Sequence, residues 1–202
     1  MHINSHLAVG VIFTSILHFF LNFPLIEFVI IVTFSFICDF DIFFSKYAKD
    51  NNHRLLISHS IIPSIIIIIF GYILNYSVLV FGGLSYAIHI ILDTLDWGTN
   101  FFYFQKKQIG FKLLISKEEY KNLPKYLARY KNPASFFDEK YYKNKVCLAT
   151  EISLFILMTL SILLFAVQYL FILLLYFLGL YFHLHRHFTL KKIEQNNRNS
   201  YF

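Results

Sequence analysis

The sequence predicts an all-α fold, a bundle of apolar helices that crosses a membrane several times. Of the 202 residues, 57% are hydrophobic and 25 are phenylalanine, which is too apolar for a soluble domain of this size. The apolar residues gather in six segments, at 7–21, 24–38, 60–74, 77–93, 147–167 and 169–187. All 18 lysines and arginines fall outside the interiors of these segments, at 46–54, 106–145 and 186–198. This distribution is typical of a polytopic membrane protein.

Segment length predicts how many of the helices cross the bilayer. A single helix from Cys147 to Phe188 would be ~60 Å long, about twice the bilayer core, so we expect it to fold back at Gln168. The first four segments are shorter than the ~20 residues that a span usually needs. We predict six membrane-spanning helices, with four spans as the main alternative. The expected regions are a four-helix metal-site region (1–98), a basic aromatic loop in the cytoplasm or at the membrane surface (99–146), a helical hairpin (147–188) and a frayed polar tail (189–202).

The positions of the basic residues predict the orientation. No lysine or arginine lies in the turns near Asn22, Asn75 and Gln168, so the positive-inside rule places these turns outside and both termini in the cytoplasm of a cell (inner) membrane. The net charge of +6 is explained by this topology and by anionic membrane lipids, so no nucleic-acid partner is expected. We expect the first helix to be retained, because no basic residue precedes it and no cleavage site follows it.

The same topology brings histidines and carboxylates together at the cytoplasmic helix ends. Ionisable groups are costly beside a membrane, and imidazole with carboxylate is the usual ligand set of catalytic zinc, iron or manganese. We therefore predict a divalent metal site, most readily zinc, with manganese or iron as alternatives. The predicted ligands come from the start of the first helix, the end of the second, the start of the third and the end of the fourth. They are His6, Asp39, Asp41, His53, His59, His89 and Asp93.

Spacing indicates how some of these residues act. His89 and Asp93 share one helix face, so both can bind one ion or Asp93 can orient His89; a His–Asp hydrogen bond without metal is the alternative. Asp39 and Asp41 point about 200° apart on an α-helix, so they reach one ion only from a non-helical turn. Ser58 is the expected N-cap of the third helix.

Further polar residues lie on the same predicted side. Arg54, a planar double donor, is predicted to neutralise the anionic group of a substrate. Glu151, near the start of the fifth helix, is predicted to be a general base or a further ligand. The tract of His183, His185 and His187 resembles a metal site, but only the first and last share a helix face, so we interpret it as interfacial.

The order of these motifs resembles that of the YdjM-like family, LexA-binding inner-membrane proteins regarded as metal-dependent hydrolases and distantly similar to zinc-dependent phospholipase C. The resemblance covers about residues 1–100. It rests on the early histidine, the Asp-x-Asp after the second helix, the His-Arg and His-Ser pairs and the final His-x-x-x-Asp. The matching residues are His6, Asp39, Asp41, His53, Arg54, His59, Ser60, His89 and Asp93. Ile42 stands where the family often has histidine, Ser58 replaces threonine, and the spacing from His53 to His59 is one residue longer.

The predicted chemistry is hydrolysis of a phosphoester or another anionic ester, because one or two divalent ions would lower the pKa of bound water towards ~7 and polarise the ester. The expected substrate is an anionic small molecule or a lipid, and the depth of the site, at the headgroup level, favours a lipid-linked or phospholipid phosphoester. The alternative is a metal-binding membrane protein without catalysis, or a transporter, although transporter sites usually lie near the bilayer midplane. The sequence leaves the oligomeric state open.

Overall fold

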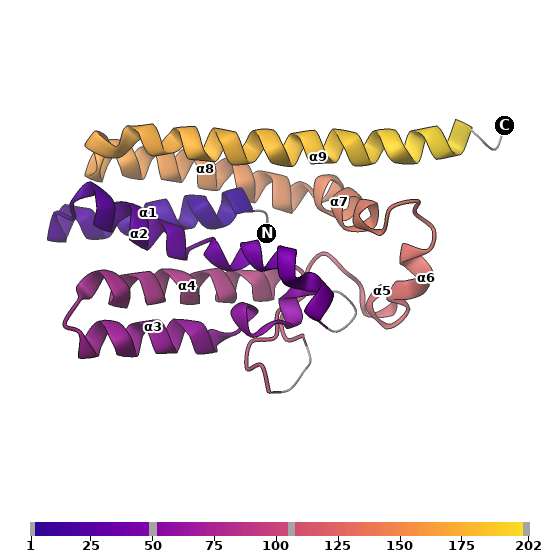
Figure 1. Ribbon diagram of the computed structural model, residues 1–202. Helices are drawn as coiled ribbons and strands as arrows, with labels where there is room; N and C mark the ends of the chain where they lie inside the picture. The colour runs from indigo at the N-terminus through magenta and orange to yellow at the C-terminus, as the bar shows by residue number, and fades with distance from the viewer. Residues whose placement is uncertain (1–2, 49–51, 105–107, 200–202) are drawn as a thin grey trace.

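The computed structural model describes residues 3–48, 52–104 and 108–199 (Figure 1). Within these ranges the regular structure is helical, apart from one antiparallel bridge between Thr99 and Ile109, so the predicted all-α class is confirmed. The helices that correspond to the six apolar segments are α1 (Ile3–Leu21), α2 (Leu25–Phe34), α3 (Ile61–Ile73), α4 (Ser77–Asp96), α8 (Lys145–Phe165) and α9 (Leu173–Asn199).

Four helical stretches are long and apolar enough to cross a membrane. They are Ile3–Leu21, Ser77–Asp96, Lys145–Phe165 and Val167–Asn196. Helices α2 and α3 are apolar but shorter. At 1.5 Å per residue, α2 is only about 15 Å long, against a bilayer core of about 30 Å.

Three helical hairpins, α1–α2, α3–α4 and α8–α9, place their turns at one end of the bundle (left in Figure 1). Asn22 and Asn75 each have φ of +50°, a left-handed conformation that asparagine tolerates better than most residues. The third turn is η5 (Val167–Ile172), which contains Gln168. There the hydroxyl of Tyr169 donates to the carbonyl of Phe23 at 2.7 Å and joins two of the turns.

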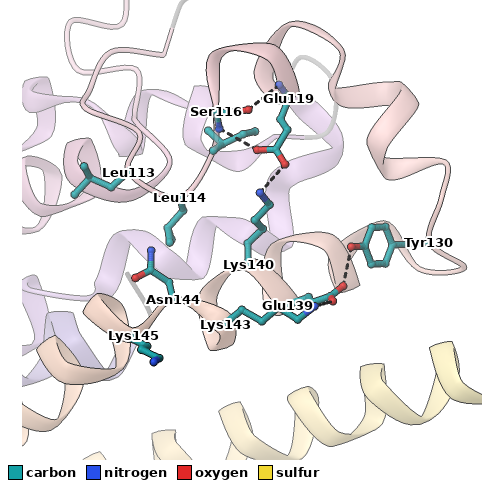
Figure 2. A pocket seen from close by; sticks show the side chains of 11 residues that line it. Leu113, Leu114, Ser116, Glu119, Tyr130, Glu139, Lys140, Lys143, Asn144 and Lys145 are labelled. Atoms are coloured by element: carbon teal, nitrogen blue, oxygen red, sulfur yellow. Dashed lines mark hydrogen bonds and ion pairs between the residues drawn. The ribbon is translucent and has the colours of Figure 1, made fainter.

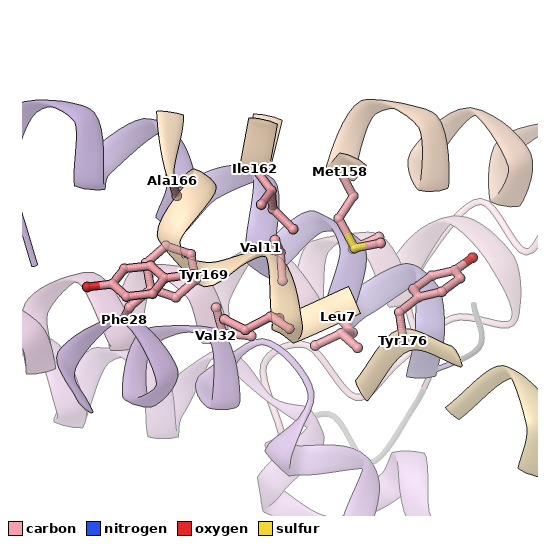
Figure 3. Close-up of a cluster of buried hydrophobic side chains, with 11 residues drawn as sticks. Leu7, Val11, Phe28, Val32, Met158, Ile162, Ala166, Tyr169 and Tyr176 are labelled. Atoms are coloured by element: carbon pink, nitrogen blue, oxygen red, sulfur yellow. The ribbon is translucent and has the colours of Figure 1, made fainter. Parts of the chain in front are cut away.

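The main apolar core lies where α8 and the start of α9 pack on α1 and α2 (Figure 3). Its members are buried and come from these four helices and from the η5 turn: Leu7, Ala8, Val11, Phe28, Val32, Met158, Ile162, Ala166, Tyr169, Ile172 and Tyr176. Most of the remaining surface of α8 and of the first half of α9 is exposed and apolar, which suits contact with lipid. Helix α1 is therefore held between the outer hairpin and the rest of the bundle.

The segment between α4 and α8 is more structured than the predicted loop. It contains α5 (Lys117–Lys121), α6 (Leu123–Leu127) and α7 (Pro133–Lys143). The predicted frayed tail is also wrong up to Asn199, because α9 continues as one helix to that residue. Its Glu194 accepts the backbone N–H groups of Lys131 and Asn132 at 3.2 and 3.0 Å, which ties the helix to the start of α7.

Candidate metal centre

The predicted ligands converge at the end of the bundle opposite the three turns. His6 lies in the first turn of α1, whereas His89 and Asp93 lie in the last two turns of α4. Three 3₁₀ helices supply the others, namely η1 (Ile37–Tyr47), η3 (His53–Leu55) and η4 (Ile57–His59). Residues far apart in the sequence thus meet because adjacent hairpins start and end at this level.

Four side-chain atoms face one another at the centre of this cluster. From His59 Nε2, Asp93 Oδ2 lies at 3.4 Å and Asp39 Oδ1 at 3.6 Å. From His89 Nε2, the same two oxygens lie at 3.5 and 3.6 Å. The side chains of His59, His89 and Asp93 are fully buried, and neither Nε2 atom has a hydrogen-bond partner among the described residues. A buried imidazole nitrogen without a partner is costly, so this arrangement calls for a further group at its centre.

The spacing of these atoms fits a tetrahedral cation. With bonds of about 2.0–2.1 Å, as zinc makes to nitrogen and oxygen, tetrahedral ligands lie about 3.3–3.4 Å apart. The four observed separations, from 3.4 to 3.6 Å, are close to this value. Asp39, His59, His89 and Asp93 could therefore hold one metal ion.

The other ring nitrogen of each histidine is held from outside this group. Nδ1 of His89 lies 2.7 Å from the carbonyl of Ser35, and because a carbonyl only accepts, Nδ1 donates; in the neutral ring, Nε2 then presents its lone pair inward. Nδ1 of His59 lies 2.7 Å from Asp41 Oδ2, which also accepts from Ser58 Oγ. Carbonyl and carboxylate partners of this kind are usual behind metal-binding histidines.

The 3₁₀ geometry of η1 explains why Asp39 and Asp41 differ. With three residues per turn, side chains at i and i+2 point about 120° apart. Asp39 therefore approaches Nε2 of His59 while Asp41 approaches Nδ1 of the same ring. The expected helix cap was wrong: Ser58 bonds to Asp41, and Ser60 caps α3 by accepting the backbone N–H of Ile62 at 3.3 Å.

His6 and His53 border the four-atom group. The His6 ring stacks on His89 with 3.7 Å between centroids, and its Nε2 lies 3.2 Å from Asp93 Oδ1, the oxygen that faces away from the group. His53 packs edge-on against His59 and, with Asp41, forms another set of potential ligands. These residues were predicted as ligands, and the structure places them one layer further out.

Arg54 faces two carboxylates of α4. Its Nη1 and Nη2 atoms bind Asp96 Oδ1 and Oδ2 at 2.9 and 3.3 Å, and Nη2 lies 3.2 Å from Asp93 Oδ1. Nη1 also reaches the carbonyl of Gly98 at 3.4 Å. The guanidinium is largely buried. It contacts Oδ1 of Asp93, while Oδ2 of the same carboxylate faces the four-atom group. The predicted contact of Arg54 with a substrate anion stays a prediction.

Sequence reasoning overlooked three contributors. The thiol of Cys38 is buried and forms a third set of potential ligands with His59 and His89. Asp96 lies three residues after Asp93 on the same face of α4 and pairs with Arg54. The carbonyl of Ser35 could not have been found, since a backbone group leaves no mark in the sequence.

Glu151 and the histidine tract of α9 belong to other contacts. Glu151 accepts hydrogen bonds from Ser5 at 2.5 Å and from Tyr141. It is in none of the potential ligand sets among the described residues, and its role as a base stays a prediction. His187 pairs with Asp138 at 2.6 Å, and both His183 and His187 contact Tyr142 on α7. The predicted shared face of these two histidines is therefore confirmed.

A groove between α5 and α7 is lined by a separate group of residues (Figure 2). Lys140 pairs there with Glu119 at 2.5 Å, and Glu139 binds Tyr130 at 2.7 Å and Lys143. The charges of these side chains are thus largely satisfied within the protein. The groove shares no lining residue with the His/Asp cluster and does not extend it.

The carboxylates of the cluster stabilise positive charge on the neighbouring histidine rings. Burial alone would lower the pKa of His59, but contacts with Asp39 and Asp41 outweigh it and raise this pKa to about 9. Burial would raise the pKa of Asp39, yet the neighbouring histidines hold it well below its usual range. Further out, burial beside His59 and Arg54 lowers the pKa of His53 to about 4.

Comparisons of this chain with protein-family models, with curated proteins and with solved structures each find no match.

Proposed function

We propose that this protein is a membrane-bound, metal-dependent hydrolase that cleaves a phosphoester or another anionic ester at the membrane surface with metal-activated water. The observation that carries the proposal is the four-atom group of Asp39, His59, His89 and Asp93, at tetrahedral spacing with inward imidazole nitrogens. Membership of the YdjM-like family is part of the same proposal.

The donor set favours zinc over manganese or iron. Six-coordinate ions with bonds near 2.1 Å need neighbouring ligand atoms about 3.0 Å apart, which is shorter than the separations of 3.4 to 3.6 Å found here. Two imidazoles and two carboxylates are ordinary zinc ligands. When bound, such an ion supplies Lewis acidity and lowers the pKa of water towards ~7.

The protein contributes orientation and access. Asp41 and the Ser35 carbonyl fix the rotation of the two histidine rings, and Arg54 fixes Asp93. Asp39 is the one member of the four whose side chain is partly exposed, at 20%, so water and substrate reach the centre on its side. In our proposal Arg54 also meets the anionic group of the substrate, and Glu151 accepts a proton.

One feature favours the second candidate, a metal-binding membrane protein without catalysis. Four protein ligands are the rule in structural zinc sites, whereas catalytic sites keep three and leave one position open. The partial exposure of Asp39 supports the hydrolase. In our proposal, the coordination position beside this carboxylate is the one that water and substrate would take. Both candidates require bound metal, and only the hydrolase requires turnover.

Metal analysis of the purified protein, combined with a screen of generic phosphoesters, tests the proposal. We expect about one zinc per chain and phosphoester turnover that disappears after chelation and returns with zinc. Asp39→Asn should keep the metal with reduced turnover, because the amide can still ligate through oxygen but carries no charge. Bound zinc without turnover of any ester would favour the non-catalytic candidate, and absence of metal would contradict both.

The proposed orientation places the His/Asp cluster and both termini on the cytoplasmic side. It is supported by the position of the three turns, which lack lysine and arginine, at the opposite end of the bundle. We expect Tyr120→Cys to be labelled by an impermeant thiol reagent only from the cytoplasmic side, and Asn75→Cys only from outside. Labelling of position 120 from outside intact cells would overturn the orientation and the side of the site.

A further inference from the structure

The segment η1, which carries Asp39, has an apolar outer surface. Its exposed large side chains are Ile37, Phe40, Ile42, Phe43, Phe44 and Tyr47. In a helix with three residues per turn, side chains at i and i+3 lie in line, so Ile37, Phe40 and Phe43 form one edge. Phe40 is 49% and Phe43 74% exposed, and their rings stack with 6.5 Å between centroids.

The inner side of η1 is built differently. Cys38 and Asp41, also three residues apart, are buried against the His/Asp cluster. A run of eleven residues in 3₁₀ geometry is much longer than usual. Because residues three apart lie in line, η1 has an inner edge that faces the cluster and an aromatic outer edge. Large exposed apolar patches on a protein mark contact with a membrane or with another protein.

The position of η1 indicates that its apolar surface contacts the lipid bilayer. Helix α2, which precedes η1, is only about 15 Å long and cannot span the bilayer core alone. At about 2 Å per residue, η1 adds about 22 Å of chain whose outer surface is also apolar. Lys46 is exposed near its end, as expected where a membrane segment meets anionic headgroups.

We propose that η1 inserts into the cytoplasmic interface of the bilayer and that the metal centre opens towards the lipid through the gap beside Asp39. Among the side chains of the four-atom group, only that of Asp39 is partly exposed, and it lies next to the aromatic edge on the same 3₁₀ helix. A ligand of the metal centre therefore approaches from the membrane, so the substrate class is an amphiphile whose anionic head enters while its apolar part stays in the bilayer. This inference rests on the metal centre of the proposed function, but not on hydrolysis.

Nitroxide labels test the insertion directly. The labels are placed by Phe43→Cys, Leu164→Cys and Tyr120→Cys in a Cys147→Ser background, in vesicles of phosphatidylcholine and phosphatidylglycerol. Leu164, exposed on α8, is the membrane control and Tyr120, on α5, the aqueous control. We expect the label at 43 to collide with oxygen and to be shielded from a water-soluble nickel complex, as at 164. Collision with nickel as frequent as at 120 would overturn the proposal.

Chelator access tests the entrance. In zinc-loaded vesicles, we expect lipid-soluble phenanthroline to remove zinc at least tenfold faster than water-soluble EDTA. Phe40→Ser combined with Phe43→Ser should speed removal by EDTA about tenfold without changing zinc content, whereas Leu164→Ser should not. Equal rates for the two chelators in the unmodified protein, or no effect of the double substitution, would contradict a lipid-facing entrance. If no zinc binds, the proposed function fails, while the nitroxide result still decides the insertion.

Discussion

His59→Ala and Asp93→Ala are each expected to lose bound zinc, whereas His185→Ala is expected to keep it. The first two substitutions remove atoms of the four-atom group, which lie 3.4 Å apart in fully buried side chains. His185 contacts Tyr181 on its own helix and belongs to no ligand set among the described residues. We expect the zinc affinity to fall by more than 100-fold in each ligand variant, measured by competition with a chromogenic chelator.

The outer residues provide a graded control for this prediction. Asp41→Ala removes the partner of His59 Nδ1 but no atom of the four-atom group, so a loss of ~10–100-fold is expected. Circular dichroism in detergent should show unchanged helix content in all four variants. Asp93→Asn, which preserves the side-chain volume, guards against misfolding of Asp93→Ala. Equal zinc affinity across the set would show that the cluster does not bind metal as proposed.

Arg54→Ala is expected to cause the second large effect, a loss of ~3–5 kcal/mol in the free energy of unfolding. The substitution removes the cation that faces Asp93 and Asp96 at 3.2 and 2.9 Å in a largely buried setting. Removing one partner of such a pair leaves charge in a medium of low dielectric constant. Reversible unfolding in mixed micelles measures the change, and Asp96→Ala in a double-mutant cycle isolates the pair.

Arg54→Lys separates stability from the substrate contact predicted from the sequence. Lysine keeps the positive charge but not the planar fork that reaches both oxygens of Asp96. We expect full zinc occupancy, an intermediate loss of stability and turnover of an anionic ester at least ~10-fold lower, or about 1.4 kcal/mol in the barrier. Unchanged turnover would remove Arg54 from substrate binding and leave it a structural role only.

The sequence by itself determined the helical class, the apolar segments and the turns. The turns at Asn22, Asn75 and Gln168 follow from short polar breaks between long apolar runs, which no tertiary contact is needed to recognise. The confinement of lysine and arginine to other segments then placed the seven predicted ligands at one end of the bundle. That inference depends only on the chain reversing its direction at each turn. In the structure these residues do lie close together.

Only the tertiary structure decided which atoms face one another. Asp39 and Asp41 were indistinguishable in the sequence, and the 3₁₀ winding of η1 turned one to each nitrogen of His59. Local sequence distinguishes poorly between α and 3₁₀ winding, since both place i and i+3 near each other and packing selects between them. The pairing of Arg54 with Asp96 depends in the same way on η3 lying against the end of α4. Side-chain direction is set by packing between segments, and that information is absent from any single stretch of the chain.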